Sequence, residues 1–108
     1  MAKRGIYRRR HRKDGNQDAI VAFYRACGVS VYMVGEPVDL VVGLGGVTDL
    51  VEVKTEAGKL NPDQVAFSDG WLGSLWCVRS LPDVRRHVVS LQRRSKLLGA
   101  AREAEKAS

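Results

Sequence analysis

Two strongly apolar runs, at residues 38–42 and 48–53, lie on either side of a glycine-rich stretch and constrain the fold more than any other feature of the sequence. Short runs rich in β-branched residues and bounded by glycine predict strands, and Gly45-Gly46 is a natural two-residue hairpin turn. Nearly continuous apolar runs are typical of strands that are covered on both faces. The sequence therefore predicts a tight β-hairpin in the middle of a sheet.

A two-residue turn at Gly45-Gly46 also fixes which residues face each other. It pairs Leu44 with Val47, and counting outward along both strands places Asp39 directly opposite Glu52. Paired side chains of this kind are about 5 Å apart at Cβ. Because side chains alternate along a strand, Lys54 lies on the same face as these two acids. Three ionisable groups are thus expected to converge.

Two carboxylates at this distance repel each other unless a cation or a proton lies between them, and oxygen ligands of this kind suit Mg²⁺ or Mn²⁺. A divalent ion would polarise a phosphate oxygen and acidify a water molecule, while Lys54 supplies a fixed positive charge. The pattern indicates a metal-dependent phosphodiester hydrolase with Asp39, Glu52 and Lys54 as catalytic residues. The alternative is a solvated Glu52–Lys54 salt bridge with Asp39 as a chance acid.

The net charge of +6 is unevenly distributed along the chain. Residues 1–13 carry a net charge of +7, residues 14–84 carry −6, and residues 85–108 carry +5. An acidic centre between two basic ends is typical of a cation-binding site flanked by phosphate-binding arms. The alternative for residues 1–13 is a basic tail that only promotes solubility.

At 108 residues the chain is expected to form one domain, small enough that a partner subunit would help it. Cys27 and Cys77 show no disulfide or zinc spacing, so both are expected to be buried thiols. The sequence shows neither a signal-peptide pattern nor a run of about 18 apolar residues, which favours a protein of the cytoplasm, or of the host cytoplasm if it is encoded by a phage.

A first helix is predicted to open at Asp14, with Gln17 completing a capping box, and to end at Gly28. Its buried face is expected to contain the residues Ile20, Phe23, Tyr24 and Cys27. Asn16 and Gln17 project toward the same side. Either amide can reach a metal-bound water or a phosphate, or it can only cap its own helix.

Four more elements follow the pattern. We expect a strand at residues 29–34 and a further strand at residues 74–79. Between them we expect a second helix that is capped by Asn61 and has Gln64 in its first turn. Gln64 comes just after the loop that follows Lys54 and is expected to support the site, the alternative being an exposed surface glutamine. The last helix opens at Pro82, and its apolar stripe consists of Val84, Val88, Leu91 and Leu98.

The basic residues expected to contact DNA phosphates come from both ends of the chain and from the loop after Lys54. They are Lys3, Arg4, Arg8, Arg9, Arg10, Arg12, Lys13, Lys59, Arg85, Arg86, Arg93 and Arg94.

This order of elements, with an acid on the second strand and Glu-x-Lys on the third, resembles the core of the PD-(D/E)xK nuclease superfamily, most closely the small phage and archaeal Holliday-junction resolvases and the VRR-NUC nucleases. The resemblance is carried by the segments GEPVDL at 35–40, VEVKT at 51–55, GKLNPDQ at 58–64 and VRS at 78–80. It implies an α/β fold with an αβββαβ core, in which helices flank a mixed four-stranded sheet. The resemblance spans about residues 14–86. Together with the charge pattern, it leads us to expect a basic arm at 1–13, a nuclease domain at 14–101 that includes the C-terminal helix, and a frayed tail at 102–108.

The resemblance further implies that Mg²⁺ is bound by Asp39, Glu52 and the backbone carbonyl of Val53, with Lys54 positioning the attacking water. Many resolvases carry a glutamate on the first helix, where this chain has Asn16 or Gln17. Family resolvases are symmetric dimers, which suits a four-way junction. We therefore expect a homodimeric Mg²⁺-dependent endonuclease that resolves Holliday junctions in DNA recombination. The alternatives are the same chemistry on nicked, flapped or duplex DNA, and a non-catalytic DNA-binding module.

Overall fold

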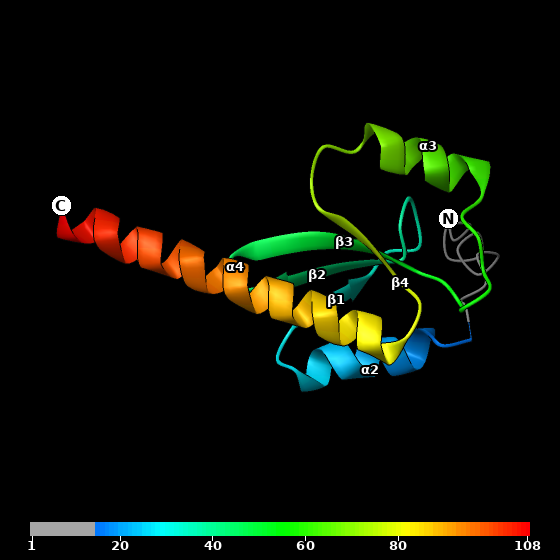
Figure 1. Ribbon diagram of the computed structural model, residues 1–108, viewed down its shortest axis with the longest axis horizontal. Helices are drawn as coiled ribbons and strands as arrows, with labels where there is room; N and C mark the ends of the chain where they lie inside the picture. Colours follow the sequence, from blue (N-terminus) through cyan, green and yellow to red (C-terminus); the bar gives the residue numbers. More distant parts are fainter. Residues whose placement is uncertain (1–14) are drawn as a thin grey trace, which may run out of the picture.

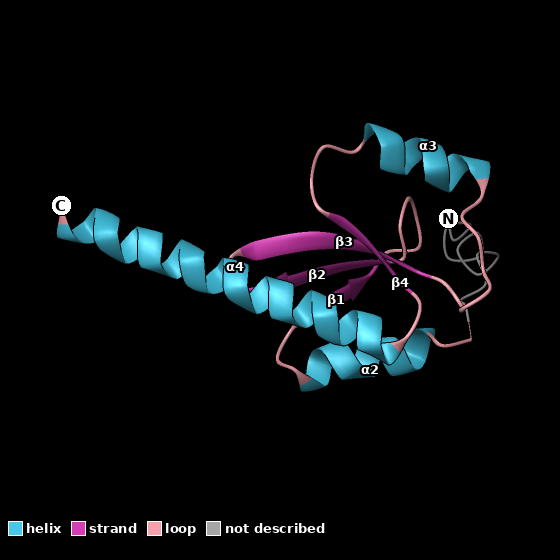
Figure 2. Cartoon of the chain, viewed as in Figure 1, coloured by secondary structure: helices cyan, strands magenta, loops and turns pink. Residues whose placement is uncertain are grey.

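A mixed four-stranded sheet lies between two helices on one face and one helix on the other in the computed structural model, which describes residues 15–108 (Figures 1 and 2). The elements in chain order are α2 (Gln17–Ala26), β1 (Ser30–Met33), β2 (Leu40–Leu44), β3 (Val47–Val53), α3 (Pro62–Gly70), β4 (Leu75–Val78) and α4 (Leu81–Ala107). This confirms the α/β class and the mixed sheet expected from the sequence. Within residues 15–108, no helix is both long and apolar enough to cross a membrane.

The central hairpin has the predicted register. β2 and β3 are antiparallel, and the pairs run from Leu44 with Val47 at the turn to Leu40 with Val51 at the far end. Gly45 and Gly46 have φ angles of 54° and 88°, which residues with a side chain rarely adopt. The turn therefore depends on both glycines, as the sequence indicated.

The strands are arranged in sequence order across the sheet. β1 pairs antiparallel with β2, β2 antiparallel with β3, and β3 parallel with β4. A parallel pair needs a long crossover connection, and here residues 54–74 with α3 make it. This crossover places α3 on the face of the sheet opposite α2 and α4 (Figure 1).

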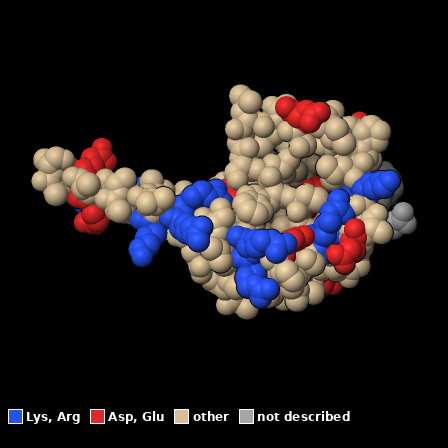
Figure 3. Space-filling view, viewed as in Figure 1, with Lys and Arg blue, Asp and Glu red and all other residues tan. Residues whose placement is uncertain are grey.

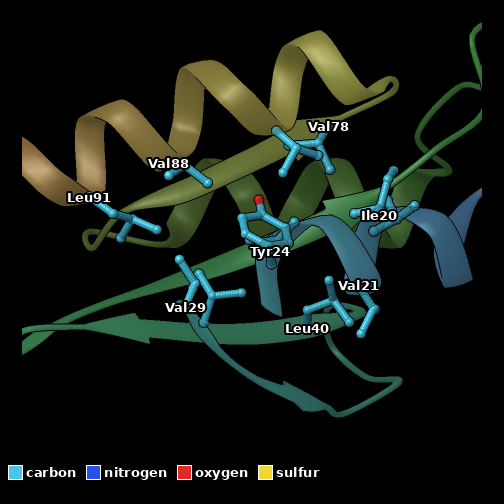
Figure 4. Close-up of a cluster of buried hydrophobic side chains, with 12 residues drawn as sticks. Ile20, Val21, Tyr24, Val29, Leu40, Val78, Val88 and Leu91 are labelled. Carbon is cyan, nitrogen blue, oxygen red and sulfur yellow. The ribbon is translucent and has the colours of Figure 1, made fainter. Parts of the chain in front are cut away.

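The hydrophobic core lies between the sheet and the pair α2 and α4 (Figure 4). The fully buried side chains include Ile20, Tyr24, Leu40, Val42, Val51, Val53, Val78, Val84 and Leu91. On α2 the buried face was predicted to include Phe23 and Cys27, but these are only half-buried, and Val21 is buried instead. The stripe faces both β1 and α4, so it is rotated relative to the one expected.

The ends of the helices differ from the predictions in two places. α2 begins at Gln17 with Asn16 at the N-cap position and no side-chain cap, whereas Asp14, the predicted cap, lies outside the described residues. Residues 102–107, predicted to fray, continue α4 as a helix to Ala107. The second half of α4 projects from the body of the molecule (Figure 1).

The two cysteines also differ from the prediction. Both thiols are free, but Cys27 is only half-buried and Cys77 is exposed. Cys77 pairs with Glu52 in the β3–β4 ladder, so its side chain shares the sheet face that α3 covers only in part.

Candidate functional site

Asp39 and Glu52 meet at the end of the hairpin farthest from its turn. Asp39 directly precedes β2, one position beyond the Leu40–Val51 pair, so it continues the register toward Glu52 on β3. The two carboxyl groups share a hydrogen bond. Asp39 Oδ2 also accepts a hydrogen bond from the backbone N–H of Val53, at 2.8 Å. The structure thus brings the two predicted acids together and ties Asp39 to the neighbouring strand.

Glu52 is held in an environment that disfavours its charged form. Only 6% of the residue is exposed. Burial is the largest cause that raises its pKa to about 8, followed by the negative charge of Asp39 and the hydrogen bond with it. Lys54 opposes this shift, with its Nζ 3.9 Å from Glu52 Oε2. At neutral pH the acid pair therefore retains a proton unless a cation replaces it.

Lys54 is near the acids, as predicted, and its side chain is largely buried, with 16% exposed. An ammonium group in such a position is a fixed positive charge that is only weakly screened by solvent. The three ionisable groups predicted to converge therefore do so.

Gln64 connects α3 to the acid pair. Its backbone N–H donates to Asn61 Oδ1 and its Oε1 accepts from the Asn61 N–H, both at 2.9 Å, which is a complete capping box. Because Oε1 is used there, Nε2 is directed to Glu52 Oε2, 2.5 Å away. Gln64 thus contacts Glu52 directly, and Asn61 sets the orientation of the Gln64 amide.

Asn16 reaches the backbone beside the site. Its Nδ2 donates to the carbonyls of Lys54 and Arg79, each at 3.1 Å, and so joins the start of α2 to the ends of β3 and β4. Asn16 Oδ1 and Gln17 Oε1 are buried and have no hydrogen-bond partner among residues 15–108. Asn16 therefore positions the chain around Lys54 through its nitrogen, and its side-chain oxygen receives no hydrogen bond from the described part of the chain.

A cavity of about 80 Å³ opens between α3 and the sheet at this point. It is lined by Pro37, Val38, Glu52, Leu60, Gln64, Phe67, Ser68, Leu75 and Cys77. Its lining is mainly apolar, which explains why Glu52 is poorly solvated.

The donor chemistry of the site fits a hard divalent cation. Asp39 and Glu52 are paired oxygen ligands whose repulsion a cation would relieve, and Val53 lies between Glu52 and Lys54 as the source of a backbone carbonyl. Across residues 15–108 there is no group of three or more His, Cys, Asp or Glu side chains arranged to hold a metal ion. A metal held here would therefore take its remaining ligands from water or substrate, as Mg²⁺ commonly does.

The residues predicted to contact DNA differ in their exposure and in their partners. Lys3, Arg4, Arg8, Arg9, Arg10, Arg12 and Lys13 lie outside the described residues. Lys59, Arg85 and Arg93 are exposed, and Arg86 is exposed but pairs with Asp83. Basic side chains gather along α4 in the view of Figure 3.

Arg94, which was predicted to contact DNA phosphate, pairs with a buried acid of the fold. It donates to both carboxylate oxygens of Asp49, at 2.9 and 2.6 Å. Its charge is therefore compensated within the fold.

A buried polar cluster that was not predicted from the sequence lies on the other face of the sheet. Asp49 Oδ2 lies 2.6 Å from His87 Nε2, and His87 Nδ1 lies 2.6 Å from the hydroxyl of Tyr24. Trp76 stacks on His87 with the ring centres 4.3 Å apart. Two features of the sequence could have indicated this cluster. Asp49 is two residues from Val51 and so shares the core-facing side of β3, and His87 falls within the apolar stripe of α4.

Compared with protein-family models, curated proteins and solved structures, the chain matches none of them.

Proposed function

We propose that this protein is a Mg²⁺-dependent endonuclease of the PD-(D/E)xK type that hydrolyses phosphodiester bonds in branched DNA, with the four-way junction as its preferred substrate. One observation carries the proposal: Glu52 shares a hydrogen bond with Asp39, has a pKa raised to about 8, and lies beside the ammonium group of Lys54. A purely structural salt bridge would not need a second carboxyl group beside its buried acid.

Each residue has a distinct role in this proposal. Asp39 and Glu52 hold the ion, with Val53 contributing its carbonyl by analogy with the family. A bound Mg²⁺ would supply Lewis-acid polarisation of the phosphate and lower the pKa of a water molecule. Lys54 orients the attacking water and stabilises negative charge that develops on the phosphate. Gln64 fixes the rotamer of Glu52 through its hydrogen bond to Oε2.

We propose a homodimer as the active form, because a single small subunit with one site cuts one strand, whereas two sites related by a two-fold axis can make paired cuts across a junction. Measuring the mass in solution by light scattering tests this part. A strictly monomeric protein that still makes paired cuts would contradict it.

The test of activity compares a labelled four-way junction, a splayed arm, a nicked duplex and a linear duplex, each with Mg²⁺ or with chelator. We expect Mg²⁺-dependent cleavage that favours the junction. Equal cutting of linear duplex would remove junction resolution and favour a nuclease of broader specificity.

Glu52→Gln is the informative variant, and Glu56→Gln is its matched control because Glu56 is an exposed acid in the following loop. We expect Glu52→Gln to lose at least about 100-fold in cleavage rate, since a metal ligand is lost, and Glu56→Gln to cleave as the wild type does. Full activity of Glu52→Gln would overturn the assignment of Glu52 as a ligand.

A further inference from the structure

The C-terminal end of α3 carries an apolar group that the roles proposed above do not use. The rings of Phe67 and Trp71 stack, with centroids 5.5 Å apart and planes inclined by 23°. Trp71 is 42% exposed and the next residue, Leu72, is 99% exposed. We call Phe67, Trp71 and Leu72 the aromatic platform. Large apolar side chains exposed together on a small protein commonly mark a binding surface.

The platform is preorganised by its neighbours. A Cβ at Gly73 would lie 2.8 Å from Trp71 Nε1, so the indole ring lies against a backbone position where a side chain would not fit. Phe67 supports the ring from the preceding turn of α3. The exposed part of Trp71 is therefore offered in a defined orientation, which lowers the entropic cost of binding.

The platform is continuous with the site of the acid pair. Phe67 lines the cavity that also contains Glu52 and Gln64. Trp71, four residues further along, stacks on Phe67. The acid pair and the platform are therefore linked through Phe67, which borders the cavity and stacks on Trp71.

The charge of the surface around α3 determines which part of a DNA molecule can bind there. The sequence between Lys59 and Arg79 contains no Lys or Arg but has two acids, Asp63 and Asp69. The lobe formed by α3 accordingly shows red and tan atoms in Figure 3, whereas blue atoms gather over α4. Phosphates are repelled from such an acidic surface, so DNA can contact α3 favourably only through its uncharged and flat parts, the bases.

We propose that the aromatic platform binds a nucleobase that has left the base stack next to the cleaved phosphate. This inference rests on the proposed function and deepens it, because it identifies the substrate feature that the site selects. A base stacks on an aromatic ring whatever its identity, since every base has a π-face. Fully paired duplex offers no such base. A flap or a splayed arm offers one directly, and a four-way junction offers one when a base pair at its branch point opens. The platform therefore selects structure and not sequence.

The test uses the Glu52→Gln background, so that binding is measured without cleavage. The probe is a splayed-arm DNA with 2-aminopurine at the first unpaired position, compared with a duplex of the same sequence. The variants are Trp71→Ala, Trp71→Phe and the control Leu97→Ala, which removes another exposed apolar side chain, 69% exposed, from α4. Circular dichroism verifies that each variant is folded.

We expect Trp71→Ala to weaken binding of the splayed arm by about 5- to 100-fold and to abolish quenching of 2-aminopurine, because stacking is lost. Binding of duplex by Trp71→Ala should be unchanged. Trp71→Phe should retain most of the affinity and the quenching, and Leu97→Ala should resemble its parent.

Equal affinity of Trp71→Ala and its parent for the splayed arm overturns the inference; if the wild-type protein still cleaves branched DNA, the proposed function stands without it. A Trp71→Ala protein that differs only in its self-association overturns the inference in favour of a protein contact. Failure of the wild-type protein to bind any DNA overturns both the inference and the proposed function.

Discussion

At the scale of single residues, Glu52 determines the behaviour of the site. Its carboxyl group is buried against a second acid and an apolar cavity lining, and among the described residues Lys54 provides the compensating charge. Such a group is stable as the neutral acid or as the ligand of a cation, and it is unstable as a free anion. Two predictions follow from this difference.

The first prediction concerns stability and pH in the absence of divalent ions. The pKa of Glu52 is raised from 4.5 to about 8 by folding, so its proton stabilises the folded state fully at low pH. This contribution is lost progressively as the pH rises from about 4.5 through about 8. Glu52→Gln removes the titration. In the presence of chelator, the melting temperature of Glu52→Gln should therefore rise relative to that of the wild type as the pH increases through this window. A constant difference would contradict the raised pKa.

The second prediction concerns Mg²⁺ above the pKa of Glu52. An ion that binds only the folded state at 100 times its Kd stabilises it by about 2.7 kcal/mol. We expect Mg²⁺ to raise the melting temperature of the wild type and of the control Glu56→Gln at alkaline pH. Glu52→Gln should show little or no rise. An equal rise in all three proteins would place the ion elsewhere.

The position of the acid pair could be predicted because a glycine turn fixes register and alternation fixes the face. The contact from Gln64 was foreseen only as support for the site. Its direction depends on the capping box with Asn61, which uses Oε1 and leaves Nε2 for Glu52. The pKa of Glu52 was not predictable, because it depends on the cavity that the crossover through α3 creates.

At the scale of elements, α4 is fixed to the sheet by a buried polar cluster. Burial alone would raise the pKa of Asp49, but hydrogen bonds from Arg94 and His87 outweigh it and lower that pKa. Burial lowers the pKa of His87, so its neutral ring donates from Nε2 to Asp49 and accepts the hydroxyl of Tyr24 at Nδ1. The cluster joins α2, β3 and α4, and every buried member of it has a partner.

The third prediction tests this connection. Asp49→Ala should lower the free energy of unfolding by about 3 to 5 kcal/mol, because it leaves buried donors without their acceptor. Asp69→Ala, at an exposed acid on α3, is the control and should change it by less than about 0.5 kcal/mol. Urea denaturation provides the measurement. Similar values for the two variants would show that the cluster contributes little.

The fourth prediction concerns the contact between α4 and the hairpin turn. Gly45 has a positive φ, and a Cβ there would lie 2.7 Å from the Cβ of Ser95. Gly45→Ala should therefore destabilise the fold by about 1 to 3 kcal/mol. Gly99→Ala is the matched control, since Gly99 is helical and no described atom lies within 4 Å of its added Cβ. It should stabilise the fold by up to about 1 kcal/mol. Equal effects would mean that α4 moves freely away from the turn.

The elements themselves were largely predictable, because glycine and proline mark their ends and apolar periodicity marks their type. Two contacts of α4 were not predicted, for physical reasons. His87 was overlooked because a histidine contributes little to an apolar stripe, although Asp49 and Tyr24 satisfy both of its nitrogens. Arg94 was assigned to phosphate because a single sequence does not reveal that Asp49 faces it across 45 positions.

At the scale of the whole molecule, the distribution of charge determines how DNA can approach. The chain places an acidic centre between basic ends, and in the described part the exposed cations lie mainly on α4. The molecule measures 51 × 29 × 27 Å, and the projecting half of α4 accounts for its long axis (Figure 1). Phosphates are therefore expected along α4, and the bases beside α3.

The fifth prediction follows from this arrangement. Each phosphate contact contributes about 0.9 to the slope of log K against log salt concentration. Replacing Arg85 and Arg93, which are exposed and have no ion pair among the described residues, should reduce that slope by up to about 1.8. The affinities for junction and duplex should fall together, because phosphate contacts carry no information about structure. Lys106→Ala, at the projecting end where Lys106 pairs with Glu103, should leave the slope nearly unchanged. If the slope does not respond to loss of the two arginines, DNA approaches by a route other than α4, and residues 1–13 become the main candidate for the phosphate contacts.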